Sequence, residues 1–167
     1  MLLYHSKNDT YHCIYRMLSI ITILWLSEIQ LLKLRIIDFY VLFPGLLVEV
    51  PLPRVPGASS VKKSAGSIKH GYERLPASTR LFSELSFNQS QAVNILRAKD
   101  IVTLTEDVVK PSDMFLCGAL PKVVSGGNLA KDDFLRTAIK ILGAIELYGN
   151  SGLKARSNLV EARYDVF

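Results

Sequence analysis

The first third of the chain carries two successive stretches in which hydrophobic residues fall on all sides of a helix. The first spans residues 10–25 and the second residues 28–43, where Lys33, Arg35 and Asp38 interrupt the apolar run. This all-round pattern is typical of a helix that is buried in a core or held against another protein. We therefore predict two helices around which the rest of the chain is organised.

Polar residues at the ends of these stretches predict where the helices begin and end. Asp9 or Thr10 is suited to cap the first helix, and Ser27 with Gln30 has the spacing of a capping box for the second. Pro44 predicts the end of the second helix, because proline disfavours a helical conformation in the residue before it.

Arg35 and Asp38 are three residues apart in the second helix, so their side chains can meet on one face. We expect them to form a structural ion pair that orients this helix.

The composition changes over residues 51–75, which are rich in Pro, Gly and Ser. Such a segment buries too little surface to become ordered, and it predicts a long mobile loop. The loop is basic, and one hypothesis is that Lys62, Lys63 and Lys69 contact the phosphate backbone of DNA. The alternative is a solvated linker whose lysines contribute to solubility.

The next segment predicts two helices and a hairpin. Pro76 suits the first position of one helix, and Asn88 suits the cap of a second. Residues 101–105 predict a strand, with residues 108–109 as its return. Two helices followed by a hairpin outline a winged helix, in which Asn and Arg are residue types that read base edges.

Residues 111–128 are loop-like in composition. Asn128 is suited to cap an amphipathic helix that Gly149 would end, and residues 153–167 are either a further helix or a docking strand.

The predicted fold class is therefore predominantly α: a helical domain with a winged-helix-like helix pair plus a short β-hairpin. We divide the chain into an apolar N-terminal helical pair (1–50), a basic flexible loop (51–75), and winged-helix-like and C-terminal helices (76–167). The length of 167 residues fits one domain overall.

Composition and charge narrow the functional classes. With 49% hydrophobic and 21% charged residues the chain is not disordered overall, and a net charge of +5 permits an anionic partner without requiring one. The longest charge-free run in the first third, residues 17–27, is shorter than the roughly 20 residues of a membrane span. We expect a cytoplasmic protein with no membrane segment. Cys13 and Cys117 fit a reducing compartment, with one long-range disulfide as the alternative.

The sequence contains no combination of residues that is typical of a catalytic or metal centre. The His and Cys residues lack paired ligand spacing, and a phosphate-binding G-x-x-x-x-G-K-[ST] motif is missing. Ser60 and Lys63 fit S-x-x-K, but without the companion motifs. We interpret the adjacent Asp132 and Asp133 as partners of a helix dipole. The sequence therefore predicts no enzyme activity, no cofactor and no metal.

The amino-acid sequence of several segments resembles that of the middle component of bacterial ABC three-component systems, which include the Lamassu-type anti-phage defence operons. The matching residues are Tyr11-His12 before an apolar helix, Leu34-Arg35-Ile36-Ile37-Asp38-Phe39-Tyr40, Phe43-Pro44, Arg74-Leu75-Pro76, and the closing Leu153-Lys154 and Arg163-Tyr164-Asp165.

This resemblance implies a non-enzymatic adaptor that links an SMC-like ABC ATPase to an effector, often a nuclease, with DNA contact through the complex. The alternative from another class is a stand-alone winged-helix DNA-binding regulator, and a third is a membrane-associated helical protein.

Two helices that are apolar all round are difficult to hide within one small domain, and large apolar patches on a protein usually mark interaction sites. We therefore predict that part of the N-terminal pair is covered by the ATPase. The predicted partner-binding residues are the aromatics Tyr15, Trp25, Tyr40 and Phe43, since aromatics dominate binding hot spots. The alternative is that these four are internal core residues.

Overall fold

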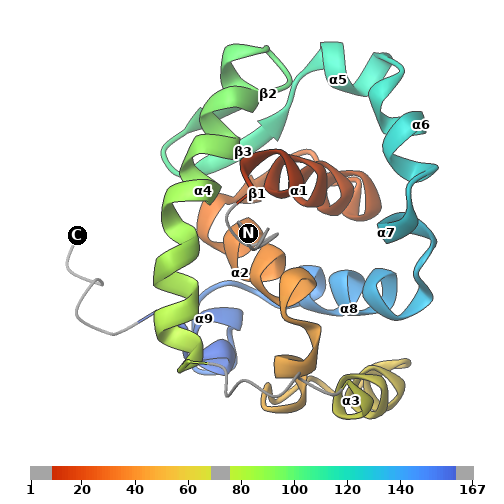
Figure 1. Ribbon diagram of the computed structural model, residues 1–167, viewed down its shortest axis with the longest axis vertical. Helices are drawn as coiled ribbons and strands as arrows, with labels where there is room; N and C mark the ends of the chain where they lie inside the picture. The colour runs from red at the N-terminus through yellow and green to blue at the C-terminus, as the bar shows by residue number, and fades with distance from the viewer. Residues whose placement is uncertain (1–8, 69–75, 161–167) are drawn as a thin grey trace, which may run out of the picture.

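The two apolar helices lie at the middle of the computed structural model, which describes residues 9–68 and 76–160. They are α1 (Thr10–Leu24) and α2 (Leu31–Leu42), and they contact each other. In Figure 1, α4 (Ser78–Ala98) runs along one side of this pair, and α5 (Asp113–Cys117), α6 (Leu120–Ser125) and α7 (Asn128–Lys131) run along the other. Below them lie α3 (Ala58–Ser67), α8 (Asp133–Ala144) and α9 (Leu153–Ser157).

The start of α1 confirms the predicted cap. The Asp9 carboxylate accepts hydrogen bonds from the backbone N–H groups of Tyr11 and His12, at 2.8 and 3.1 Å. These bonds satisfy two donors that have no partner inside the helix. The helix ends at Trp25, which adopts a left-handed conformation with φ of 47°.

The predicted capping box of α2 is wrong. Residues 29 and 30 form a short strand, β1 (Ile29–Gln30), which pairs antiparallel with β3 (Val108–Pro111). The N–H of Leu31 then donates to the carbonyl of Asp107 at 2.7 Å. The beginning of α2 is thus held by the backbone of a distant hairpin, and no side chain caps the helix.

The predicted end of α2 is confirmed. The helix stops at Leu42, and Pro44 opens a 3-10 helix, η2 (Pro44–Val48). Proline is favoured at this first position, because its missing N–H would have no helical partner there.

The predicted mobile loop is wrong for part of residues 51–75, because residues 58–67 form α3. Ala58, Val61 and Ala65 are buried at spacings of three and four, and α3 packs on η2 and α8. Small side chains allow this close packing, although the Ser- and Gly-rich composition resembles that of a linker. Residues 69–75 lie outside the described residues.

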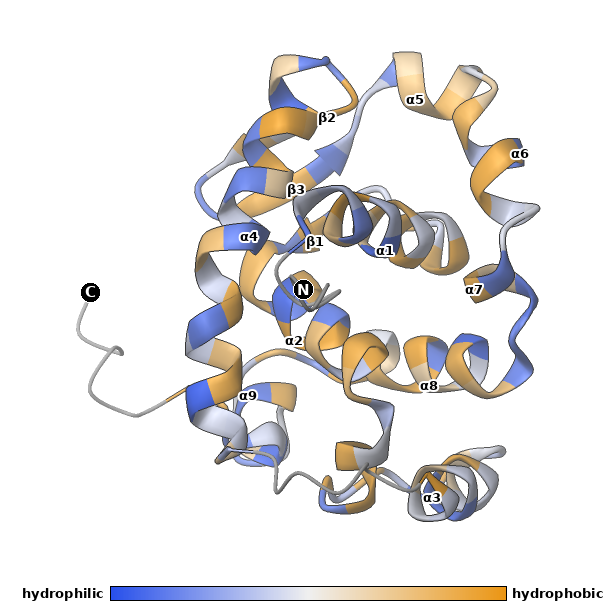
Figure 2. Cartoon of the chain, in the orientation of Figure 1, coloured by the Kyte–Doolittle hydropathy of each residue, from blue (hydrophilic) through white to orange (hydrophobic). Residues whose placement is uncertain are grey.

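The predicted helix pair is one continuous helix, α4, which passes Asn88 without a break. Instead of capping a second helix, the Asn88 side chain accepts a hydrogen bond from the Thr10 hydroxyl of α1 at 3.3 Å. The inner face of α4 is apolar, and hydrophilic residues lie on its outer side (Figure 2).

The predicted hairpin is confirmed and forms part of a small sheet. Strand β2 (Val102–Thr105) pairs antiparallel with β3, so that the strand order is β1-β3-β2. The predominantly α fold with a short hairpin therefore stands as predicted. The helix that precedes the hairpin is single where a pair was predicted.

The C-terminal third is more helical than its composition suggests. The short helices α5 and α6 occupy a segment that was predicted to be a loop. Asp132, and not Asn128, caps α8 by accepting from the N–H of Leu135 at 2.9 Å. The same helix ends at Ala144, before the predicted stop at Gly149.

A buried polar cluster joins α1, α2 and α4 inside the apolar core. Asp38 of α2 is fully buried and forms an ion pair with Arg16 of α1, whose Nε and Nη2 atoms lie 2.7 and 3.2 Å from its two carboxylate oxygens. Gln89 of α4, also fully buried, donates to Asp38 at 2.9 Å and to the carbonyl of Arg35 at 3.1 Å. One carboxylate therefore orients three helices.

The predicted ion pair between Arg35 and Asp38 is wrong. The Nε of Arg35 donates to Gln89 Oε1 at 2.9 Å, and its guanidinium lies 5.1 Å from the centre of the Phe82 ring. The partners of Arg35 are thus the Gln89 amide and the face of the Phe82 ring. Arg16, which is more distant in sequence, binds the Asp38 carboxylate.

We expect Asp38→Ala to lower the free energy of unfolding by about 3–5 kcal/mol, because it leaves the Arg16 charge buried without a counter-ion. Chemical denaturation followed by circular dichroism measures this loss. The matched control is Glu28→Ala, which breaks the exposed ion pair with Lys110 and should cost about 1 kcal/mol or less. Equal losses for the two variants would contradict the structural role of Asp38.

Candidate interaction site

Two of the four aromatic residues predicted to bind a partner face the interior. Tyr40 is only 3% exposed, and its ring lies 5.2 Å from that of Phe39. Phe43 is half-buried, with its ring 5.3 Å from the same Phe39. In this structure the side chain of Tyr40 is not accessible to another protein, and Phe43 offers only part of its ring.

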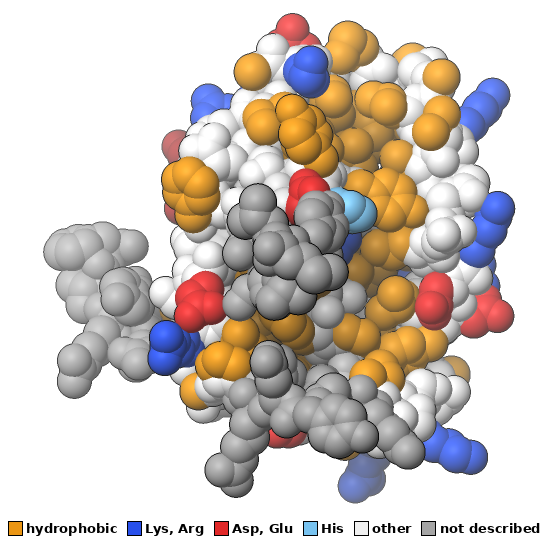
Figure 3. Space-filling model, viewed as in Figure 1, with side chains coloured by type: hydrophobic (Ala, Val, Ile, Leu, Met, Phe, Trp, Pro, Cys, Tyr) orange, Lys and Arg blue, Asp and Glu red, His pale blue; other side chains and the backbone are white. Residues whose placement is uncertain are grey.

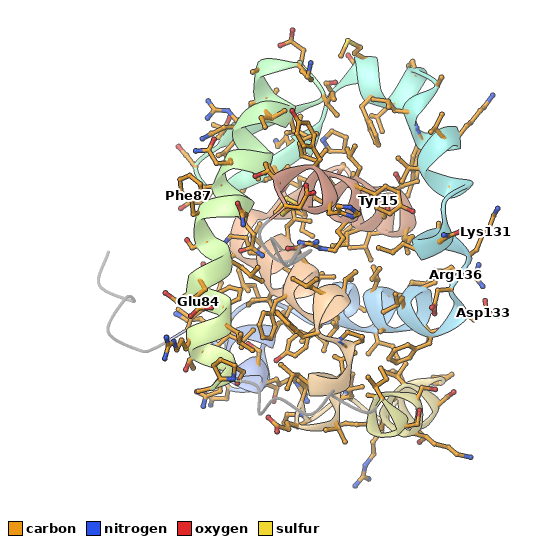
Figure 4. All side chains as sticks on the ribbon, viewed as in Figure 1. Tyr15, Glu84, Phe87, Lys131, Asp133 and Arg136 are labelled. Carbon is orange, nitrogen blue, oxygen red and sulfur yellow. The ribbon has the colours of Figure 1, made fainter. Side chains whose placement is uncertain are left out.

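Tyr15 occupies an intermediate position between α1 and α7 (Figure 4). It is half-buried, and its hydroxyl oxygen accepts a hydrogen bond from the N–H of Leu129 at 3.4 Å. The same hydroxyl lies so close to Gly127 that a Cβ there would be 2.1 Å away. Tyr15 therefore holds the turn before α7 against α1.

Trp25 is the predicted aromatic that the structure leaves accessible. It is 57% exposed at the end of α1, and the adjacent Leu26 is also exposed. Because Trp25 adopts a left-handed backbone conformation, its position is set by the turn that leads from α1 into β1. A large apolar side chain on such a turn is a candidate anchor for another protein.

A second apolar area was missed by the sequence analysis. The short helices α5 and α6 expose Met114, Leu116, Leu120 and Val123, the last of which is 69% exposed. We call these four residues the α5–α6 surface. Figure 3 shows hydrophobic side chains gathered over α1 and toward this segment. Leu116, Leu120 and Val123 have helical spacings of four and three, but the chain leaves the helix between Cys117 and Leu120, so only their accessibility identifies the surface.

Other exposed aromatics lie at the opposite end of α1. Tyr11 follows Thr10, whose hydroxyl donates a hydrogen bond to the Asn88 side chain, and Phe87 precedes Asn88 on α4. Figure 4 shows Phe87 on the outer side of α4, on the same helix as Glu84. Each is more than two-thirds exposed.

The lysines predicted to contact DNA are not gathered into one basic patch by the described residues. Lys62 donates to the carbonyl of Val48 at 2.7 Å and so joins α3 to η2, and burial lowers its pKa. Lys63 is exposed on the same helix. Lys69 lies outside the described residues. Contact of these three residues with DNA stays a prediction.

The buried cluster brings titratable groups together but closes them off. Burial, and then the charge of Asp38, raise the pKa of the Cys13 thiol to about 12, with its sulfur 3.7 Å from the carboxylate. Burial would lower the pKa of Arg16, but the charge and hydrogen bonds of Asp38 outweigh this effect and raise it. A protonated thiol and a satisfied ion pair offer neither a nucleophile nor a base.

The remaining motifs have structural partners or lie apart from any cluster. Ser60 and Lys63 are both exposed on α3, whereas an acylated serine needs a buried site. Asp132 caps α8, and Asp133 pairs with Arg136 one turn later; Figure 4 shows this pair at the outer end of the helix beside Lys131.

Metal ligands and membrane spans were searched for over residues 9–68 and 76–160. No group of His, Cys, Asp or Glu residues in these ranges has the arrangement of a metal site. In the same ranges no helix combines the length and the hydropathy needed to cross a bilayer. Both described cysteines are free thiols, Cys13 buried and Cys117 exposed, so the alternative of a disulfide between them is not realised.

Comparison with known families gives a match over almost the whole chain. The model of the ABC-three component (ABC-3C) system Middle Component 5 family matches residues 2–165. No curated protein and no solved structure matches the chain.

The two thiols should differ sharply in reactivity. At pH 8, N-ethylmaleimide should modify Cys117 rapidly and leave Cys13 unmodified in the folded chain, because Cys13 is buried and stays protonated until the pH approaches about 12. Mass spectrometry of the labelled protein counts the adducts. In denaturant both thiols should react, and rapid double labelling of the native chain would contradict the closed cluster.

Proposed function

The chain belongs to the ABC-three component system Middle Component 5 family, and on this basis we propose that it is a non-enzymatic adaptor subunit of a cytoplasmic anti-phage defence complex. In this proposal it links an SMC-like ABC ATPase to a nuclease-like effector, as in Lamassu-type systems. As a middle component of a system with several components, the chain has partner proteins.

The observation that carries the adaptor proposal is the distribution of exposed apolar side chains. The N-terminal helices bury most of their apolar residues inside the chain, yet Trp25 and the α5–α6 surface remain in solvent. Obligate and other stable interfaces are built around such aromatic and aliphatic anchors. An adaptor needs exposed apolar surfaces of this kind. We propose that Trp25 and the α5–α6 surface bind the ATPase.

The stand-alone winged-helix regulator loses its main support. That hypothesis rested on two helices in front of a hairpin, the second of which would enter the DNA major groove. Since α4 is one continuous helix, the segment offers no turn between a supporting and a recognition helix.

The Trp25→Ala variant tests the proposed interface. Trp25 is the chain's single tryptophan, so its fluorescence reports on one site. In the free chain iodide should quench this emission, and binding of the ATPase should protect it. Replacement by Ala should weaken binding by about 2 kcal/mol or more, as is typical of an aromatic hot spot.

The control for this experiment is Phe87→Ala, which removes an even more exposed aromatic from the outer side of α4. Affinity for the ATPase, measured by interferometry on purified subunits, should be unchanged in this variant. The proposed interface would be contradicted by two results together. These are full affinity of the Trp25→Ala variant for the ATPase, and continued iodide quenching of Trp25 in the complex of the wild-type chain.

We also expect the purified chain to hydrolyse neither ATP nor DNA, because the buried carboxylate of Asp38 is committed to Arg16 and Gln89 and the sequence motifs do not assemble into a reaction centre. Phosphate release and plasmid cleavage assays check this, with the assembled complex as the positive control. Activity of the chain alone, lost in a point variant of its own residues, would make it an enzyme.

A further inference from the structure

A groove of about 720 Å³ lies between the C-terminal half of α8, residues 53–56 and the segment that leads into α9. Its size is in the range of ligand-binding pockets. Thr137, Lys140, Ile141 and Ala144 line it from one face of α8, at spacings of three and four. Val55, Pro56 and Tyr148 form its other apolar walls.

Two contacts hold the walls of this groove in place. Arg156 of α9 donates from Nη1 to the carbonyl of Pro51 and from Nε to the carbonyl of Ser151, which joins the two segments on either side. Gly57, with φ of +87°, approaches α8 so closely that a Cβ would lie 2.8 Å from Thr137. The groove is thus formed before any ligand arrives, which reduces the cost of binding.

The charges around the groove favour an acidic ligand. Lys140 and Arg156 both line it, and neither is paired with a carboxylate among the described residues. The lining also contains one acid, the exposed Glu146. The groove therefore carries two cations and one carboxylate, beside the ring of Tyr148, which is 64% exposed.

The start of α9 offers no backbone cradle for a phosphate group. A phosphate cradle needs free backbone N–H groups. Here the N–H groups of Gly152, Leu153 and Lys154 donate internally to the carbonyls of Gly149, Glu146 and Leu147, at 2.7 to 3.0 Å. Apolar walls with a small excess of side-chain cations match a peptide that alternates aliphatic and acidic side chains.

We propose that this groove binds a short acidic and aliphatic peptide segment of a partner subunit, with the aliphatic side chains against Ile141 and Tyr148 and the carboxylate at Lys140 and Arg156. The proposal rests on the proposed adaptor function. It gives the chain a further contact surface, built from α8, residues 53–56 and the segment before α9.

The experiment uses the full chain and an array of short overlapping peptides that tile the ATPase and effector of the same system. The wild-type chain should retain peptides in which Asp or Glu is next to Leu, Ile or Val. Ala144→Arg places a long side chain in the groove from an exposed helix end, and Lys140→Glu reverses a rim charge. Each should bind these peptides about tenfold or more weakly.

Matched controls come from α4. Ala98 is the exposed last residue of that helix, as Ala144 is of α8, and Lys99 is an exposed lysine next to it. Ala98→Arg and Lys99→Glu change bulk and charge by the same amounts outside the groove. Both should bind the peptides like the wild-type chain.

The outcomes separate this inference from the adaptor proposal. If the wild-type chain co-purifies with the subunits but no peptide binding depends on Ala144 and Lys140, the groove assignment is overturned and the adaptor proposal stands. If co-purification fails while groove-dependent peptide binding is found, the adaptor proposal is overturned and the groove assignment stands. A rise in melting temperature with ATP that Ala144→Arg abolishes would make the groove a nucleotide site, and would also overturn the inference.

Discussion

The carboxylate of Asp38 is the constraint on which the helical core depends. A charge that is fully removed from water must be neutralised and hydrogen-bonded, and Asp38 meets both conditions through Arg16 and Gln89. Those partners come from α1 and α4, so the position of α2 is fixed relative to both helices. Every buried side-chain N or O atom among the described residues has a partner, which keeps this polar cluster compatible with the apolar core around it. Apolar packing alone tolerates several rotations of a helix that is hydrophobic all round, whereas a bidentate pair tolerates one.

Fixing these helices determines which surfaces remain for other proteins. Once α1 and α2 face each other and α4, residues such as Tyr40 become internal, and the apolar character of the N-terminal pair no longer requires a partner. The apolar side chains that stay exposed include those at the end of α1, where the chain turns into β1, and those of the short helices α5 and α6, the second of which packs on α1. The accessible apolar area is therefore displaced from the most hydrophobic part of the sequence to the elements that enclose it.

Local rules predicted the elements whose signals are local. The Asp9 cap, the proline after α2 and the β2–β3 hairpin follow from residue types within a few positions. The partner of Asp38 could not be predicted from local rules, because Arg35 is the nearer cation in sequence and only the tertiary arrangement brings Arg16 to the carboxylate. The start of α2 was missed for the same reason: the N–H of Leu31 is satisfied by Asp107, far along the chain. In α3, small residues conceal a helical face that exists only because η2 and α8 supply the opposing surface.

The candidate sites were harder to predict than the fold, because accessibility is a property of the assembled chain. Aromatic content identified Trp25 together with residues that turned out to be internal, and no sequence signal marked the α5–α6 surface or the groove beside α8. The groove requires residues 53–56, α8 and the segment before α9 to meet, and it requires Arg156 to bond the carbonyls of both Pro51 and Ser151. Its charges likewise come from separate elements, with Lys140 on α8, Glu146 after that helix and Arg156 on α9. Whether a surface can select a partner is therefore set by which segments the fold brings together, and not by the residue types of any one segment.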